Sequence, residues 1–245
     1  MNTVIPISIV IVLILLFFLK RISGYILLHY INKIYSLFIY EQEYHDTNYS
    51  WCKELRDNYL EIKKEYINYI NNHGKLKRFK EIDKVQTNYD VSDIPWDVLF
   101  LRVYNQDTSK IVYFPKTYKL ISNTPGCSLA MFSVLHPGKM IPPHQGPFKG
   151  VLRYHLALVT PKDYKKCTIK VNKIKYNWKE GDDVMFDDTF VHSVKNDTDE
   201  TRIVLFLDIQ KDFKNIFLDT INSIILYFGK FNDSVSNIVL NTNNS

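Results

Sequence analysis

The distribution of apolar residues divides the chain into regions of different character. Val4–Leu19 is apolar on every side and carries no charge. Residues 22 to about 85 place apolar residues at helical spacing among charged and tyrosine-rich positions. From about Pro95, short runs rich in Val, Ile, Phe, Leu and Tyr alternate with turn signals such as Pro137-Gly138. These changes predict an apolar N-terminal segment, a helical region and a β-rich domain.

The first segment predicts a transmembrane helix within residues 1–21. A spanning helix needs about twenty apolar residues, with roughly 17 as the lower limit, and snorkelling by Lys20 makes up the shortfall. A cleaved signal peptide is less favoured, because Met1–Thr3 carries no side-chain charge and no small-residue cleavage pattern follows. A buried core helix is less favoured because all faces of the run are apolar. We therefore expect contact with the lipid bilayer through residues 4–19.

The orientation of this single-pass anchor follows from its flanking charges. Lys20 and Arg21 directly after the apolar run favour a cytosolic catalytic domain. Four Asn-x-Ser/Thr sequons would suit a luminal domain instead; they begin at Asn48, Asn196, Asn232 and Asn243.

The remaining boundaries follow from the same patterns. We expect a helical stalk or packing region over residues 22–94 and a mainly β jelly-roll domain over 95–210, because short strands at regular spacing are typical of that fold. A helix is expected over 211–230 and a disordered, Asn/Ser/Thr-rich tail over 231–245. The helix carries an apolar stripe that is expected to pack against the barrel: Phe213, Ile216, Phe217, Thr220, Ile221, Ile224, Ile225 and Phe228.

Composition narrows the class of protein. A hydrophobic content of 46% over 245 residues supports a buried core. The net charge of +5 is mild and no dense basic block is present, so nucleic acid is not an expected partner. Cys52, Cys127 and Cys167 have no metal-ligand spacing and form no even disulfide set, which predicts ordinary packing.

Chemistry-bearing side chains gather in the β-rich domain. His144, His192 and Arg202 fall within about sixty residues of one another. Alternation along a strand places Arg153 and His155 on one face of Val151–Leu158. A cation and an imidazole on the inner face of a barrel are costly unless they meet an anion, a metal or a ligand. A surface strand with one polar face explains each residue singly, but it explains the group poorly.

The motifs around these residues resemble those of the aspartyl/asparaginyl β-hydroxylase family. They are FSVLHPGKMIPPHQGP (132–147), LRYHLAL (152–158), WKEG (178–181), FDDTFVHSV (186–194) and RIVLFLDI (202–209). The resemblance covers roughly residues 95–210, keeps the family's order and is specific. It implies a double-stranded β-helix with flanking helices, and a dioxygenase that uses Fe(II), 2-oxoglutarate and O2 to hydroxylate an unactivated C–H bond.

The resemblance also implies the metal site. His144 and His192 stand at the family's two iron-ligand positions. Most 2-oxoglutarate oxygenases carry a carboxylate two residues after the first histidine. That position is Gly146 here, and the family characteristically lacks the carboxylate. Asp188 stands where the family keeps an aspartate near the metal-bound water.

The co-substrate residues follow in the same way. Arg202 resembles the clamp for the distal carboxylate of 2-oxoglutarate, for which a planar guanidinium is suited. Ser133 and His155 match positions that hydrogen-bond the co-substrate. Arg153 matches a position near the co-substrate and the acidic group of a peptide substrate, and Trp96 is expected to line the same pocket.

Three functions remain open at this point. The first is a membrane-anchored hydroxylase of Asp or Asn side chains in a protein or peptide. The second is a hydroxylase of a membrane lipid acyl chain, as the resemblance to small anchored family members implies. The third is a catalytically inactive, membrane-associated binding module. Gln210-Lys211 departs from the His-Pro pair that ends the family's last strand, and the family's large helical-repeat substrate domain is not recognised here.

Overall fold

The computed structural model describes residues 24–87, 90 and 92–245, and it divides the chain into two units. The first unit, residues 1–41, contains helix α2 (Gly24–Ser36), and the second comprises Gln42–Ser245. Within the described residues, no helix combines the length and hydropathy needed to cross a membrane. The predicted anchor, residues 4–19, lies outside the described residues.

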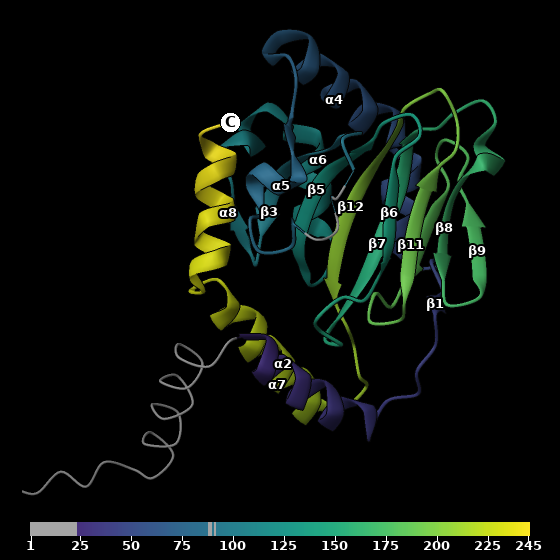
Figure 1. Cartoon of the computed structure of the whole chain (residues 1–245). Coiled ribbons are helices and arrows are strands. Elements are labelled where there is room, and N and C mark those ends of the chain that lie inside the picture. Colours follow the sequence, from purple (N-terminus) through teal and green to yellow (C-terminus); the bar gives the residue numbers. More distant parts are fainter. Residues whose placement is uncertain (1–23, 88–89, 91) are drawn as a thin grey trace, which may run out of the picture. The chain divides into compact units, whose positions relative to one another are not determined.

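Two antiparallel sheets build the second unit (Figure 1). The large sheet contains, in spatial order, β1 (Tyr44–His45), β10 (Asp183–Phe186), β7 (Val151–Val159), β12 (Arg202–Gln210), β5 (Cys127–Leu135), β3 (Trp96–Val103) and β2 (Lys77–Arg78), with β4 (Gln106–Asp107) paired to β3. The small sheet contains β6 (Met140–His144), β11 (His192–Asn196), β8 (Cys167–Val171) and β9 (Ile174–Asn177).

The strands from β5 onward pass repeatedly between the two sheets. β5, β7, β10 and β12 lie in the large sheet, whereas β6, β8, β9 and β11 lie in the small one. This alternation is that of a double-stranded β-helix, which is a jelly roll of two facing sheets. The predicted fold class, a mainly β jelly roll with flanking helices, is confirmed.

Side-chain alternation separates two cores on either side of the large sheet. Leu152, Tyr154, Leu156 and Leu158 of β7 belong to an outer core that also contains apolar residues of α3 (Ser50–Asp57), α4 (Tyr59–His73) and α6 (Pro115–Asn123). Ala157 instead faces the barrel interior with residues of both sheets. The predicted alternation of Val151–Leu158 is therefore confirmed, with His155 on the interior face.

A stalk separate from the barrel is wrong for residues 42–94, whereas the alternative of a packing region agrees with the structure. Residues 42–94 belong to the same unit as the barrel. Their helices α3 and α4 bury Cys52, Leu55 and Ile62 in the outer core, and strands β1 and β2 extend both edges of the large sheet. Helical periodicity detected the amphipathic helices, but the sheet partners of two-residue strands leave no periodic signal.

The predicted disorder of residues 231–245 is also wrong. Asn232 caps the N-terminus of helix α8 (Asp233–Asn243), because its side chain accepts a hydrogen bond from the Ser234 amide. The helix packs beside β3 and α5 (Phe79–Ile82) (Figure 1). Val235 and Thr242 are buried. The polar composition concealed an apolar face that tertiary packing stabilises.

The predicted C-terminal helix exists as α7 (Ile216–Gly229), with the side chain of Asn215 capping its N-terminus. The prediction of which face of this helix packs against the barrel is wrong. The buried positions are Leu218, Asn222 and Leu226, whereas Ile216 and Ile224 of the predicted stripe are exposed. The helix is apolar on most sides, so periodicity alone did not decide which side faces the core.

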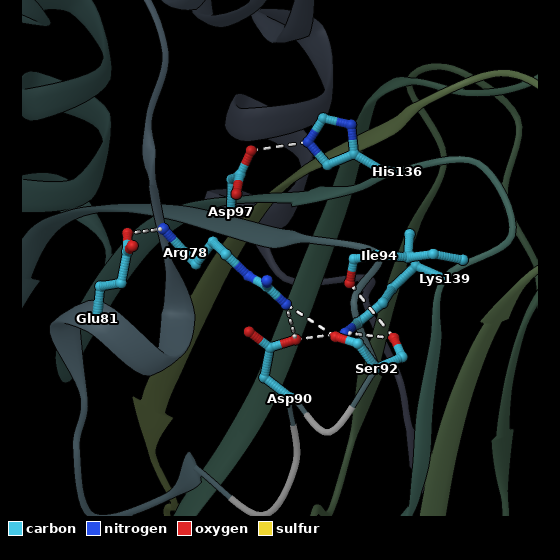
Figure 2. Close-up of polar contacts among 8 residues, drawn as sticks. All are labelled: Arg78, Glu81, Asp90, Ser92, Ile94, Asp97, His136 and Lys139. Carbon is cyan, nitrogen blue, oxygen red and sulfur yellow. Dashed lines mark hydrogen bonds and ion pairs between the residues drawn. The ribbon is translucent and has the colours of Figure 1, made fainter.

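A buried ion pair joins the turn between β5 and β6 to the loop that precedes β3 (Figure 2). Lys139, in the turn between β5 and β6, is fully buried and donates to Asp90 and to the Ser92 hydroxyl. Arg78 reaches the same Asp90 oxygen at 3.3 Å. The segment that contains Asp90 and Ser92 is thereby fixed to the β5–β6 turn.

Asn196 is buried beside this turn, and its amide donates to the backbone carbonyls of Leu135, His136 and Glu200.

Candidate active site

His144 and His192 face one another across the small sheet. They are directly paired residues of the antiparallel strands β6 and β11, and their ring centroids lie 4.1 Å apart. The strand register therefore brings together two imidazoles that are far apart in the sequence.

Backbone contacts determine which ring nitrogens can bind a metal. Nδ1 of His144 donates to the Pro142 carbonyl at 2.8 Å, and Nδ1 of His192 donates to the Phe190 carbonyl at 3.0 Å. Since a carbonyl only accepts, each Nδ1 carries the proton and each Nε2 keeps its lone pair. Burial lowers the pKa of both rings, that of His192 to about 3 with further contributions from His144 and Arg153. Both rings are thus neutral imidazoles, the form that binds divalent metals.

Gly146 leaves room for the carboxylate of Asp188. A Cβ added at Gly146 would lie 2.0 Å from Asp188 Oδ2 and 2.4 Å from Oδ1, and the Gly146 amide donates to the Asp188 carbonyl at 2.7 Å. The space that a side chain at position 146 would enter is therefore filled by a carboxylate from the loop before β11. Among the described residues, no group of three or more His, Cys, Asp or Glu side chains could hold a metal ion.

Arg153 links two carboxylates at the barrel interior. Its guanidinium contacts Asp188 Oδ2 at 2.9 Å and Asp208 Oδ1 at 3.0 Å, and it lies 4.4 Å from the centre of the Phe206 ring. Asp188 is 1% exposed, and its Oδ1 has no hydrogen-bond partner among the described residues. Burial raises the pKa of Asp188 although Arg153 lowers it.

Arg202 is a buried cation with unused donors. The residue is 1% exposed, and within the described part of the chain its Nε and Nη1 have no hydrogen-bond partner. Its guanidinium carbon lies 5.4 Å from the centre of the Trp178 ring, and burial lowers its pKa while Cys167 raises it. A guanidinium kept in this state is a site for an anionic ligand that the chain itself does not supply.

Two more buried side chains with unused polar atoms lie beside Arg202. His155 is buried, with its ring centroid 5.9 Å from Trp178 and 4.8 Å from Phe206, and burial lowers its pKa well below the ordinary value. Neither ring nitrogen of His155 nor Nε1 of Trp178 has a hydrogen-bond partner among the described residues. Polar atoms unused in one buried cluster mark a ligand site rather than a structural network.

Ser133 and Trp96 complete the inner wall next to Arg202. Trp96 Nε1 donates to Ser133 Oγ at 2.9 Å, and the Trp96 ring stacks on Phe79 with centroids 4.1 Å apart. Trp96 and Arg202 are both paired with Leu135 of β5, so the two side chains share the inner face of the large sheet. Trp96 therefore fixes the orientation of the Ser133 hydroxyl.

All the predicted site residues lie in or beside the barrel interior. Arg153 and Asp188 contact each other, Trp96 contacts Ser133, and His144 contacts His192. Sequence reasoning missed two side chains of this region: Trp178, which stood only inside a motif, and Asp208, the second partner of Arg153. The Trp178 indole nitrogen, which has no partner in the described part of the chain, could not be recognised from sequence periodicity. Asp208 shares the Arg202 face of β12, which was the available signal.

Comparison with known proteins identifies the family. The family described as aspartyl/asparaginyl beta-hydroxylase matches residues 56–212. The chain belongs to this aspartyl/asparaginyl β-hydroxylase family. An ornithine lipid ester-linked acyl 2-hydroxylase of Rhizobium tropici is 34% identical over 173 residues, which cover 70% of the chain and 61% of that protein. The human aspartyl/asparaginyl beta-hydroxylase is 37% identical over 100 residues, which cover 39% of the chain and 13% of that protein.

The family matches differ in how much of each relative they cover. The chain spans about three fifths of the Rhizobium relative and a small part of the human one. Among solved structures, a Pseudomonas putida prolyl-4-hydroxylase is similar to 64% of the chain, with a TM-score of 0.42 and 14% identity, over 88% of that structure. The family match begins at Arg56, near the end of α3 and well before β3, so it includes α4 as well as the barrel strands.

Proposed function

We propose that this member of the aspartyl/asparaginyl β-hydroxylase family is an Fe(II)- and 2-oxoglutarate-dependent hydroxylase. The observation that carries the proposal is the fully buried guanidinium of Arg202, whose Nε and Nη1 have no hydrogen-bond partner among the described residues, in the same barrel interior as two metal-competent histidines. A buried cation without an anion is unfavourable, and a dicarboxylic acid held at one end by a metal supplies the anion at the other.

The donor set fits iron. His144 and His192 each offer Nε2 of a neutral imidazole, a donor type that suits Fe(II), and their Nδ1–H bonds to backbone carbonyls hold the rings in place. When bound, Fe(II) with 2-oxoglutarate and O2 would supply the oxidising power for hydroxylation of a C–H bond. The protein's own contribution is to orient the groups and exclude water.

The co-substrate would be held by side chains of the large sheet. Arg202 would bind the distal carboxylate through N–H groups that have no partner among the described residues, and the Ser133 hydroxyl and Trp178 Nε1 are further donors to the same acid. His155 would hydrogen-bond the co-substrate between the metal and Arg202. Trp96 would line the pocket and keep Ser133 oriented.

Gly146 has no carboxylate of its own, but the Asp188 carboxylate occupies the space that a side chain at position 146 would enter. The role that we assign to Asp188 is to accept, through Oδ1, a hydrogen bond from water beside the metal; this oxygen has no partner among the residues that the structure describes. Arg153 would hold Asp188 in this position through their 2.9 Å ion pair.

A membrane lipid acyl chain is the substrate class that we favour. The match to the Rhizobium acyl hydroxylase runs over 173 residues, against 100 for the human relative, so the likeness extends beyond the barrel strands. Arg153 is already neutralised by Asp188 and Asp208. A cation shared between two carboxylates is poorly suited to recognise the acidic group of a peptide. The predicted anchor over residues 4–19 would keep the enzyme beside such a lipid.

Hydroxylation of an Asp or Asn side chain is the second candidate, supported by the human relative's name. The test supplies the full chain in vesicles with Fe(II), 2-oxoglutarate and either deuterated lipid or Asp/Asn peptides, and follows products by mass spectrometry. We expect succinate and a lipid product heavier by one oxygen atom. Oxygen in the peptide alone would favour the second candidate.

The metal assignment has its own controls. His192→Ala and His144→Ala are each expected to abolish succinate formation and weaken metal binding, because each removes one imidazole donor. Iron binding that survives loss of both histidines would refute the site. An absence of succinate from the wild-type chain would favour an inactive binding module.

A further inference from the structure

Helix α7 presents an apolar surface that folding does not use. Its outward positions and the turn that follows it carry large apolar side chains, which we call the α7 stripe: Ile216, Phe217, Ile224, Tyr227 and Phe231. Their exposed fractions are 84%, 69%, 47%, 54% and 63%. Ile224 follows Phe217 by seven residues and Tyr227 follows Ile224 by three, and these spacings place the three side chains along one side of the helix. Contiguous apolar exposure of this kind marks an interaction site.

The opposite face of α7 holds the helix on the catalytic unit. Leu218 and Leu226 are buried, and Asn222 between them is fully buried. The Asn222 amide donates to the Gly150 carbonyl at 2.7 Å, and a Cβ at Gly150 would lie 2.1 Å from Asn222 Oδ1. The helix is therefore fixed by its inner face, and the α7 stripe is left available for a partner.

The attachment point is next to the candidate active site. Gly150 ends the loop that begins after His144 and precedes β7, the strand of Arg153 and His155. The Lys211 amide, directly after β12, also donates to the Gly150 carbonyl at 2.9 Å. Helix α7, which carries the stripe, is thus hydrogen-bonded to the loop between β6, the strand of His144, and β7, the strand of Arg153 and His155.

The chemistry of the α7 stripe suits a lipid surface. Lys230 follows the helix, and its Nζ lies 3.8 Å from the centre of the Tyr227 ring and 4.9 Å from that of Phe231. Aromatic rings with a flanking lysine are typical of helices that lie in the headgroup region of a membrane. The one acidic residue of α7, Asp219, turns its carboxylate to the Phe213 amide at 2.8 Å. The cation is therefore placed where an anionic headgroup would pair with it.

We propose that the α7 stripe is a membrane-binding surface for a bilayer that contains anionic lipid. Its apolar side chains enter the boundary between headgroups and acyl chains, to a depth of about 5–10 Å, while Lys230 pairs with lipid phosphates. This contact is separate from the anchor expected over residues 4–19, whose apolar run keeps a bilayer within reach. The role of this contact rests on the proposed lipid substrate. By binding the membrane, the α7 stripe would hold the loop after His144 close to that substrate.

Site-specific labelling of the full chain tests the contact. The three native cysteines are buried, so a cysteine introduced at Phe217 or Ile224 can carry an environment-sensitive fluorophore selectively. Ile174, on the β8–β9 hairpin, is a matched control because it is 50% exposed and apolar. In vesicles of phosphatidylglycerol and phosphatidylcholine, we expect nitroxide lipids to quench the label in F217C and I224C but not in I174C. The quenching is expected to weaken without the anionic lipid.

Two results would overturn the proposal. Equal quenching by aqueous iodide at all three positions would mean that the α7 stripe faces water. Protection from iodide without quenching by lipid nitroxides would mean that protein covers it, either residues 1–41 of the chain or a second copy.

An activity measurement separates this inference from the proposed substrate. Ile224→Glu is expected to lower lipid hydroxylation about tenfold, corresponding to roughly 1.4 kcal/mol, and to leave succinate formation without added substrate unchanged. Ile174→Glu is expected to change neither. An I224E variant that hydroxylates lipid at the wild-type rate would contradict the proposal. If the wild-type chain hydroxylates no lipid, the substrate assignment fails, and the labelling result still decides the membrane contact.

Discussion

Replacing Arg202 by methionine should move stability and co-substrate binding in opposite directions. Two nitrogens of the guanidinium, Nε and Nη1, have no partner in the described part of the chain, and a charge-assisted hydrogen bond contributes about 1.5–3 kcal/mol. Loss of two such bonds corresponds to roughly 3–6 kcal/mol of 2-oxoglutarate binding, or about 10²–10⁴-fold in affinity.

The ligand-free protein should respond differently. An unsatisfied buried donor costs about 1–3 kcal/mol, whereas the lost contact with the Trp178 ring, 5.4 Å away, contributes about 0.5–2 kcal/mol. R202M is therefore expected to raise the free energy of unfolding by about 1 kcal/mol or leave it unchanged. The measurements are urea unfolding without metal or co-substrate, and calorimetric titration of 2-oxoglutarate with a redox-inert divalent metal.

Arg102 on β3 provides the matched control. Its Nε donates to Asp107 at 2.6 Å and its Nη2 at 3.3 Å, so its donors are used within the fold. R102M should lower stability by up to about 1 kcal/mol and leave co-substrate affinity unchanged. The reasoning is refuted if R202M loses several kcal/mol of stability while its 2-oxoglutarate affinity stays within about threefold of wild type.

Three further substitutions test other parts of the structure. Gly146→Asp should destabilise the fold by roughly 1–3 kcal/mol, because its Cβ would lie 2.0 Å from Asp188 Oδ2, and adding Asp188→Gly should restore most of the loss in urea unfolding. Lys139→Met should lower stability by about 3 kcal/mol, the low end for breaking a buried pair, because Asp90 stays buried with one remaining cation. Burial lowers the pKa of His45 from 6.5 to about 4, so protonation favours the unfolded chain. Stability is therefore complete above pH 6.5 and falls as the pH drops toward 4; His45→Gln should flatten this slope.

Each of these predictions has an outcome that contradicts it. Lys195, exposed and paired with Asp197 at 2.7 Å, is the control for the buried lysine, and K195M should cost less than about 1 kcal/mol. Equal losses for K139M and K195M would refute the buried-pair argument. Wild-type stability of G146D would mean that Asp188 moves aside easily. An unchanged acid slope in H45Q would assign the pH dependence to other groups.

The strands and most of the site follow from local sequence. Alternation within Val151–Leu158 identified the inner face that carries Arg153 and His155, and turn signals separated the strands of the barrel. The pairing of His144 with His192 is a matter of register between β6 and β11. The pattern within a single strand does not encode this register. The two histidines were predicted to lie in one site because the motifs around them resemble those of a known family and occur in the same order.

What could not be predicted depends on tertiary contacts. Position 146 is glycine because Asp188, far along the chain, fills the space around it. The α7 helix was assigned the wrong face because Asn222, a polar residue, is a buried anchor of that helix. The α8 helix was taken for disorder because its stability comes from packing beside β3 rather than from its composition.

The hydrogen bonds of Asn196 have a consequence for experiments that use glycosylation to locate the catalytic domain. Its amide nitrogen already donates to three backbone carbonyls and the residue is fully buried, so a sugar could be attached there only before the barrel closes. Asn48, by contrast, is exposed ahead of α3. A glycan on Asn48 in the natural host would report a luminal catalytic domain, whereas an unmodified Asn196 carries no information about membrane topology.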